Sequence, residues 1–166
     1  GADIRVTHDT SEGNAYVGTL RGFAYAATTI NNVHVKKGYL NGVCKIGGLC
    51  GGIFSKITCS NSSVTNYSIE NYDSQIVNAG FKANGEIGLD ASTVNEISNC
   101  HVENNRFNCV TYSASLWDRS VAPFIGDIRT QQAGTVKIST CEIKGTNTYT
   151  NASTGKTASF DQHRKQ

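Results

Sequence analysis

The chain lacks methionine altogether, and it contains only one proline and one tryptophan among its 166 residues. It also lacks any run of about 18 apolar residues, the length that a membrane-spanning helix requires. Insertion into a membrane is therefore not predicted. Because the chain has no methionine and starts at Gly1, we expect it to be a processed or excised segment.

A strong charge of one sign is missing as well. Lysine and arginine total 15, aspartate and glutamate total 13, and the formal net charge is +2. Nucleic acids and anionic membranes attract proteins largely through positive charge, and a chain so close to neutral lacks the field that would hold either. Nucleic acid is therefore not predicted as a partner.

Recognisable cofactor motifs are also missing. No Cys-x-x-Cys pair occurs, and the histidines do not stand at the spacing of zinc ligands, so no metal is predicted. The glycine-rich stretch 47–52 does not end in the Gly-Lys-Ser/Thr of a phosphate-binding loop. The composition offers no strand-loop-helix context for a dinucleotide. We predict no cofactor.

Glycine, asparagine, serine and threonine are abundant in place of helix-forming residues. Asparagine, serine and threonine compete for backbone hydrogen bonds and glycine loses conformational entropy, so this mixture disfavours helices. It suits short strands joined by many tight turns. The length is that of one ordinary domain.

A glycine-anchored phrase recurs four times, each time ahead of a short segment with strand-like alternation. The four copies begin at Val17-Gly18, Ile46-Gly47, Ile87-Gly88 and Ile125-Gly126. Each is followed by a matching phrase, at residues 30–35, 57–64, 97–102 and 138–143. Self-similarity with a period of roughly 30 to 40 residues is typical of stacked repeats, in which equivalent residues lie over one another.

Two sets of residues are predicted to form structural ladders through the stack. Cys59, Cys100 and Cys141 are evenly spaced along the chain, so we expect them to stack in the interior as small hydrophobic side chains. The leading glycines form the second ladder: Gly18, Gly47, Gly88 and Gly126. Local disulfides, such as Cys44 with Cys50 or Cys100 with Cys109, are also compatible with the six cysteines, and the sequence leaves their redox state open.

The matching phrase at residues 97–102 alternates with the period of two that a half-buried strand requires. This period predicts that Ser98, Cys100 and Val102 point inward, whereas Asn99 and His101 point to solvent.

The recurring unit resembles the GLUG-type repeats of bacterial surface proteins. Those repeats read approximately Val-Gly-Gly-Leu-Val-Gly, then a few residues, then Ile-Ser-Asn-Ser/Cys and alternating apolar residues. The closest stretch here is 46–64, and the similarity extends over residues 15–147, although the third copy lacks the second glycine. The resemblance implies a right-handed parallel β-helix in an exported or cell-surface bacterial protein, often an adhesin-like one. It implies no catalytic residue, because such repeats are known as scaffolding.

These patterns predict an all-β fold, a right-handed parallel β-helix (solenoid) of about four repeats. Residues 1–150 are expected to form this single domain and residues 151–166 a polar C-terminal tail. One repeat cannot bury its apolar face alone, so stability depends on neighbours stacked at about 4.8 Å. The ends of such a stack present unpaired strand edges, from which we expect end-to-end or edge self-association.

Two groups of residues are candidate sites. His34 and His101 take the same place in the repeat, with a serine in the copy between them and Glu142 in the last copy, and we interpret them as solvated surface residues. The segment with the single tryptophan departs from the repeat, and aromatic faces beside charged groups are suited to sugar rings or partner loops. The predicted ligand-binding residues are Tyr112, Trp117, Asp118 and Arg119.

The predicted function is a non-catalytic, secreted or cell-surface β-helix module, acting as a structural spacer or as an adhesion domain that binds glycan or a surface protein. The alternative is a small carbohydrate-active enzyme, a polysaccharide lyase or glycoside hydrolase. Glycosidases use two carboxylates about 5 to 10 Å apart. Two acid pairs, Asp118 with Asp127 and Glu86 with Asp90, are considered for this role, but neither recurs on adjacent repeats to form a groove. No catalytic residue is therefore predicted.

Overall fold

The computed structural model describes ten segments of the chain: residues 3–6, 16–42, 45–53, 55–71, 77–79, 82–84, 94–109, 120–125, 135–151 and 156–159. These segments contain strands and turns but no helix, and hence no helix that could cross a membrane. The protein is all-β, as its composition predicts.

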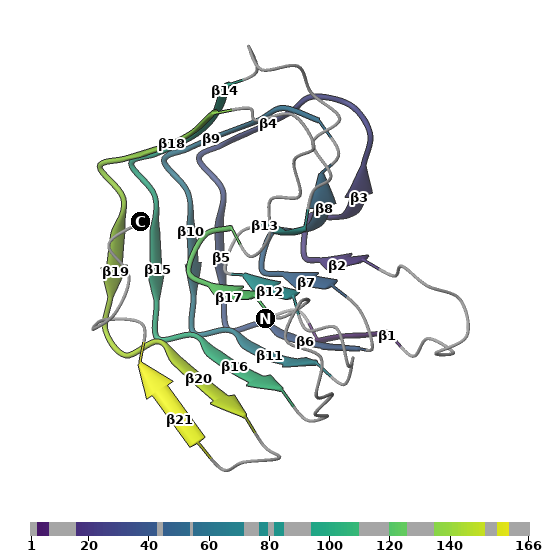
Figure 1. Cartoon of the computed structure of the whole chain (residues 1–166), viewed down its shortest axis with the longest axis vertical. Coiled ribbons are helices and arrows are strands. Elements are labelled where there is room, and N and C mark those ends of the chain that lie inside the picture. Colours follow the sequence, from purple (N-terminus) through teal and green to yellow (C-terminus); the bar gives the residue numbers. More distant parts are fainter. Residues whose placement is uncertain are drawn as a thin grey trace.

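The strands form five sheets (Figure 1). Sheet A contains β1 (Asp3–Val6), β6 (Tyr39–Gly42), β11 (Ser68–Asn71), β16 (Arg106–Cys109), β20 (Thr148–Asn151) and β21 (Lys156–Ser159). Sheet B contains β2 (Tyr16–Gly18), β7 (Lys45–Gly47), β12 (Val77–Ala79) and β17 (Ser120–Ala122). Sheet C contains β3 (Arg21–Ala24), β8 (Cys50–Ile53) and β13 (Lys82–Asn84). Sheet D contains β4 (Thr28–Asn31), β9 (Ile57–Ser60), β14 (Val94–Ser98) and β18 (Thr135–Ser139), and sheet E contains β5 (His34–Lys36), β10 (Ser63–Thr65), β15 (His101–Glu103) and β19 (Glu142–Lys144).

The chain visits the sheets repeatedly in the order D, E, A, B, C. We call each passage a round: β4 to β8 is the first, β9 to β13 the second, β14 to β17 the third, and β18 to β20 the fourth. Strands of successive rounds pair in parallel, and only the pair of β20 with β21 is antiparallel among the described strands. Figure 1 shows that, within each of sheets A, D and E, strands from successive rounds lie side by side.

Two columns of left-handed residues make two of the corners of each round. The corner between sheets D and E has positive φ angles at Asn32, Asn61, Asn99 and Thr140. The corner between sheets E and A has them at Lys37, Asn66, Asn104 and Gly145. Asparagine and glycine tolerate this region better than other residues, which explains why asparagine is so frequent in the repeated phrases.

The left-handed corner changes the phase of the alternation. Ile97 is fully buried at the end of β14, Asn99 turns the chain with a φ of 49°, and Cys100 and Val102 are buried again. The expected inward position of Cys100 and Val102 is correct. The inward position of Ser98 was wrong, because the period of two does not continue through the corner: Ser98 is half-buried and Ile97 fills the core.

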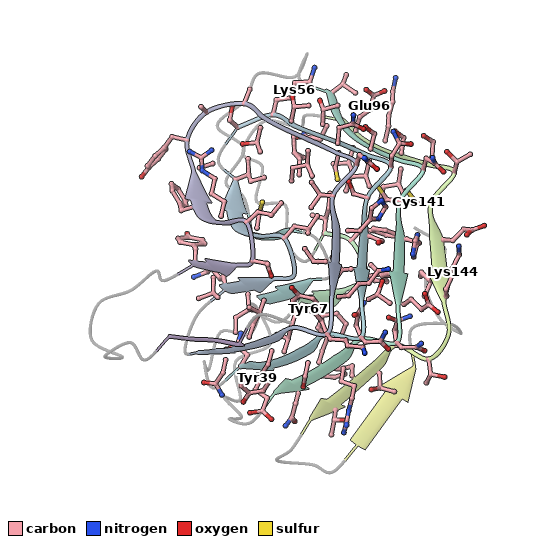
Figure 2. The ribbon with its side chains drawn as sticks, turned by 180° about the vertical axis from the view of Figure 1, so that it is seen from behind. Tyr39, Lys56, Tyr67, Glu96, Cys141 and Lys144 are labelled. Carbon is pink, nitrogen blue, oxygen red and sulfur yellow. The ribbon has the colours of Figure 1, made fainter. Side chains whose placement is uncertain are left out.

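The core between the sheets is built from columns of apolar residues with one member from each round. Sheet A contributes Leu40, Ile69 and Phe107, and sheet E contributes Val64 and Val102, all at most 2 % exposed. Figure 2 shows Tyr67 inside the sheets, whereas Lys56, Glu96 and Lys144 project outward.

The cysteine ladder differs from its prediction. Cys100 and Cys141 do take equivalent places, because β15 pairs with β19 with His101 opposite Glu142. Cys59 does not join this column, since it lies opposite Ile97 in the pairing of β9 with β14. The rounds differ in length, as the unequal intervals between the paired residues His34, Ser63, His101 and Glu142 show. Even spacing along the chain therefore does not mark equivalent positions.

The glycine ladder is shorter than predicted for the same reason. Gly18 lies opposite Gly47, as expected. The next members of this column are Ala79 and Ala122, not the predicted third and fourth glycines. Gly88 and Gly126 themselves lie outside the described residues.

Candidate functional site

The outer face of sheet E presents two columns of polar side chains. One column is His34, Ser63, His101 and Glu142, in the order expected from the repeated phrase. The other is Lys36, Thr65, Glu103 and Lys144. Because side chains alternate along a strand, both columns lie on the face opposite the core valines.

The first column contains a chain of hydrogen bonds that resembles a serine–histidine catalytic pair. Ser63 Oγ lies 2.9 Å from His34 Nδ1, and His34 Nε2 lies 3.2 Å from Asn32 Oδ1. A nucleophile also has to be reached by its substrate, but Ser63 is only 1 % exposed. The contact therefore serves to pack adjacent rounds, and we assign it no catalytic role.

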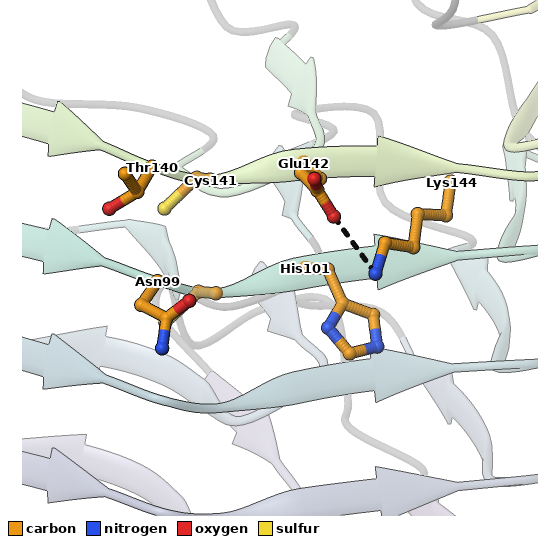
Figure 3. Close-up of a pocket in the computed structure, with 7 residues that line it drawn as sticks. Asn99, His101, Thr140, Cys141, Glu142 and Lys144 are labelled. Carbon is orange, nitrogen blue, oxygen red and sulfur yellow. Dashed lines mark ion pairs between the residues drawn. The ribbon is translucent and has the colours of Figure 1, made fainter.

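A pocket of about 480 Å³ lies where the third and fourth rounds turn from sheet D into sheet E (Figure 3). Its lining includes Asn99, His101, Thr140, Cys141, Glu142 and Lys144. An ion pair in this lining joins Glu142 Oε2 to Lys144 Nζ at 2.8 Å. The hydrogen bond from Lys144 lowers the pKa of the Glu142 carboxyl, so this pair is ionised at neutral pH.

His101 lies on the wall of this pocket. Burial lowers its pKa, and the nearby charge of Lys144 lowers it further. The imidazole of His101, together with Cys141 and Glu142 in the same lining, offers metal-binding atom types. Within the described part of the chain, however, no three His, Cys, Asp or Glu residues are grouped closely enough to hold a metal ion.

A cluster of three aromatic rings lies where β2 is followed by β3, and we call it the aromatic corner: Tyr16, Phe23 and Tyr25. The ring centroids of Tyr16 and Phe23 are 4.8 Å apart, and those of Phe23 and Tyr25 are 4.5 Å apart in an edge-to-face arrangement. Tyr25 is 80 % exposed, more than any other large hydrophobic residue in the described segments.

The rings of Tyr16 and Phe23 pack against the backbone of the glycine-rich stretch at Gly52. A Cβ atom at Gly52 would lie 2.6 Å from the Tyr16 ring and 3.1 Å from the Phe23 ring, so both rings lie against its bare backbone. The ammonium group of Lys45, only 3 % exposed, lies 5.6 Å from the centroid of Tyr16. This cation–π contact fixes the first ring of the cluster.

The aromatic corner was not predicted from the sequence. Phe23 and Tyr25 are two residues apart, which is a visible signal for one face of a strand, but Tyr16 joins them only through the turn between β2 and β3. The residues that were predicted to bind ligand, Tyr112, Trp117, Asp118 and Arg119, all lie outside the described residues. The same holds for the acid pairs considered for glycosidase chemistry.

Two of the described carboxylates are held by neighbours. Glu70 accepts hydrogen bonds from Tyr39 Oη at 2.5 Å and from Asn41 Nδ2 at 3.3 Å. Glu142 forms an ion pair with Lys144, and both lie on sheet E, whereas Glu70 lies on sheet A. Neither acid is arranged with the other as a catalytic pair.

Comparison with protein-family models, with curated proteins and with solved structures found no match to this chain.

Proposed function

We propose that this chain is a non-catalytic binding module whose aromatic corner recognises carbohydrate. Aromatic faces pack well on the apolar faces of sugar rings, and tyrosine adds a polar edge for hydroxyl groups. The single observation behind this proposal is the set of adjoining rings of Tyr16, Phe23 and Tyr25, with Tyr25 80 % exposed. Exposed Arg21 on β3 adds a charged donor beside them.

The scaffold for this site is proposed to be a right-handed parallel β-helix. Its support is the constant order of the sheets over successive rounds and the parallel pairing between rounds. The strands that carry the aromatic corner are held by parallel pairing with the next round, β2 with β7 and β3 with β8, which limits the movement of their side chains. A rigid surface loses little entropy on binding, which suits weak ligands such as glycans.

The setting of this module is proposed to be outside the cell, as a secreted or surface-attached bacterial protein of the GLUG-like type. The motif at residues 46–64 supports this proposal. In such a protein the module would act in adhesion, with the column of sheets serving as a spacer that carries the aromatic corner.

A glycan array with wild type and Tyr25→Ala tests the proposed function. Because Tyr25 is largely exposed, its truncation leaves the core intact, and we expect binding to fall by about tenfold or more. Lys137→Ala is a matched control, since Lys137 is exposed on β18, three rounds away from β4 in sheet D, and should leave binding unchanged.

The array, combined with an assay for polysaccharide degradation, also separates the other two functions. Equal binding by wild type and Tyr25→Ala would show that the glycan binds at a place other than the aromatic corner. No binding to any glycan would leave the spacer role alone. Release of reducing ends or unsaturated products from a polysaccharide would replace the binding module with the alternative, a carbohydrate-active enzyme.

A further inference from the structure

Three thiols lie close together at the corner between sheets D and E. Cys59 is on β9 in the second round, and Cys100 and Cys141 lie at the corners of the third and fourth rounds. Cys59 and Cys100 are 0 % and 2 % exposed, and Cys141 is partly exposed. The sulfur atoms of Cys59 and Cys100 are 3.9 Å apart.

The two buried sulfurs converge because their residues take different places in the round. Cys59 lies on the sheet D side of the corner, opposite Ile97, whereas Cys100 lies beyond the left-handed Asn99. Their side chains therefore approach from two sides of the same corner. A small rotation of each side chain could bring the sulfurs from 3.9 Å to the bond length of about 2.05 Å.

Cys100 and Cys141 are arranged differently, although they are neighbours in one column. Each donates to the carbonyl two residues before it, Cys100 to Ser98 O at 3.1 Å and Cys141 to Ser139 O at 3.3 Å. Their side chains thus have the same orientation on strands about 4.8 Å apart. Parallel side-chain vectors at that spacing suit a disulfide poorly.

The buried pair is also chemically unequal. The hydrogen bond from the Cys59 thiol lowers the pKa of Cys100 to about 7, and the same contact together with burial raises the pKa of Cys59. The thiolate is the nucleophile in disulfide exchange. In the folded protein Cys100 is therefore the more acidic thiol of the pair.

We propose that Cys59 and Cys100 form a disulfide that links the second and third rounds, and that Cys141 remains a thiol. The oxidant is a low-molecular-weight disulfide such as oxidised glutathione. One cysteine of the pair, as its thiolate, attacks one of the oxidant's sulfurs and releases one thiol. The other cysteine then attacks the sulfur of its partner in this mixed disulfide and releases the second thiol. Two electrons and two protons pass from the cysteine pair to the oxidant, which is reduced to two thiols.

The timing of this reaction follows from burial. Oxidants cannot reach two sulfurs that are at most 2 % exposed in the folded protein, so the bond forms during folding, before the rounds have closed on one another. The inference does not depend on the proposed carbohydrate binding, because it concerns a different part of the round.

Oxidative refolding followed by peptide mapping tests the proposal. The denatured, reduced chain is refolded with reduced and oxidised glutathione, free thiols are alkylated at acid pH, and the product is digested with trypsin. Every cysteine falls in its own tryptic peptide, and Cys59, Cys100 and Cys141 are in peptides 57–82, 83–106 and 138–144. Each pairing therefore has a distinct mass.

The expected product is peptide 57–82 linked to peptide 83–106, with peptide 138–144 alkylated. Cys141→Ser should retain this link, and Cys59→Ser should abolish it. Alkylation of peptides 57–82 and 83–106 in the refolded wild type would overturn the proposal. So would a link from peptide 83–106 to peptide 107–119 or to peptide 138–144, since either places Cys100 in another disulfide.

Discussion

At the scale of single residues, asparagine side chains take over the hydrogen bonds of backbone groups that the corners leave buried. Asn105 is 1 % exposed and makes three such contacts. Its Oδ1 accepts from Tyr67 N at 2.9 Å, its Nδ2 donates to Val64 O at 3.0 Å, and its own N–H donates to Asn147 Oδ1 at 3.0 Å. The side chain of one round thus completes the backbone of the round before it.

Asn105→Ala should destabilise the protein by about 2–4 kcal/mol, because it leaves a buried N–H and a buried carbonyl without these bonds. Urea unfolding followed by circular dichroism measures the change. Glu96→Ala, at an exposed position in the same round, should change stability by no more than about 0.5 kcal/mol. Equal effects from the two variants would contradict the role given to Asn105.

Gly38 takes the same place as Asn105, two rounds earlier, and here the missing side chain matters. A Cβ atom at Gly38 would lie 2.1 Å from the Tyr67 ring. Tyr67 is 2 % exposed, and its hydroxyl lies 2.9 Å from Thr19 Oγ1. The ring therefore occupies the volume that a side chain at residue 38 would need.

Gly38→Ala should lower stability by about 1–3 kcal/mol in wild type through overpacking against this ring. In a Tyr67→Ala background, which is itself destabilised, the same substitution should cost close to nothing. A double-mutant cycle by urea unfolding measures the difference. If Gly38→Ala costs the same in both backgrounds, the backbone rather than the ring is responsible.

At the scale of elements, the sequence predicted which polar residues share a column on sheet E, but it did not predict how many residues each round contains. The histidine column was correct because His34, Ser63 and His101 each precede the inward valine of their strand. Cys59 was misplaced because the prediction assumed a repeat of constant length. The rounds have unequal lengths, so equal intervals along the chain do not lead to equivalent positions. Ser98 was misplaced because an asparagine within an alternating segment gives no direct sign of a left-handed corner.

The aromatic corner was missed for a related reason. Its support is Gly52, from the round after Phe23, and the pairing of β3 with β8 that brings them together is invisible in linear sequence. Contacts between rounds require the register, which depends on how many residues each connection contains. Composition predicts that such strands exist, but it does not predict which strands pair or in which register.

The outer face of sheet E should make stability depend on pH through His101. Burial and Lys144 lower its pKa in the folded state, so the unfolded chain binds the proton more tightly. Stability is then greatest above the unfolded pKa of about 6.5 and falls as the pH drops towards the lower folded value. His101→Gln should reduce this loss.

Two measurements check the prediction for His101. Its ring protons, followed by NMR, should titrate with a midpoint below 6.5. Urea midpoints between pH 7.5 and 5 should fall less in His101→Gln than in wild type. A titration midpoint above 6.5 would reverse the sign and rule out the stated effect.

At the scale of the whole molecule, the two polar columns of sheet E and the apolar core continue from round to round, but the fourth round is covered unevenly. In sheet A, β21 pairs with β20 in antiparallel fashion and covers its edge. No described strand pairs with the outer edge of β18 or β19. The inward-facing side chains of the fourth round, which a further round would cover, are consequently open, with Ile138 39 % and Ile143 38 % exposed.

This end should make the protein self-associate, because unpaired strand edges beside exposed apolar side chains are templates for further pairing. Antiparallel pairing of β19 with β19 of a second copy, centred on Ile143, would place Glu142 opposite the oppositely charged Lys144. Sedimentation velocity from about 5 to 200 µM should therefore show a concentration-dependent dimer. Ile138→Lys with Ile143→Lys should shift it to monomer, while Tyr25→Lys, which places a lysine at the aromatic corner instead, should not. A wild type that stays monomeric over this range would show that the open edges alone do not drive association.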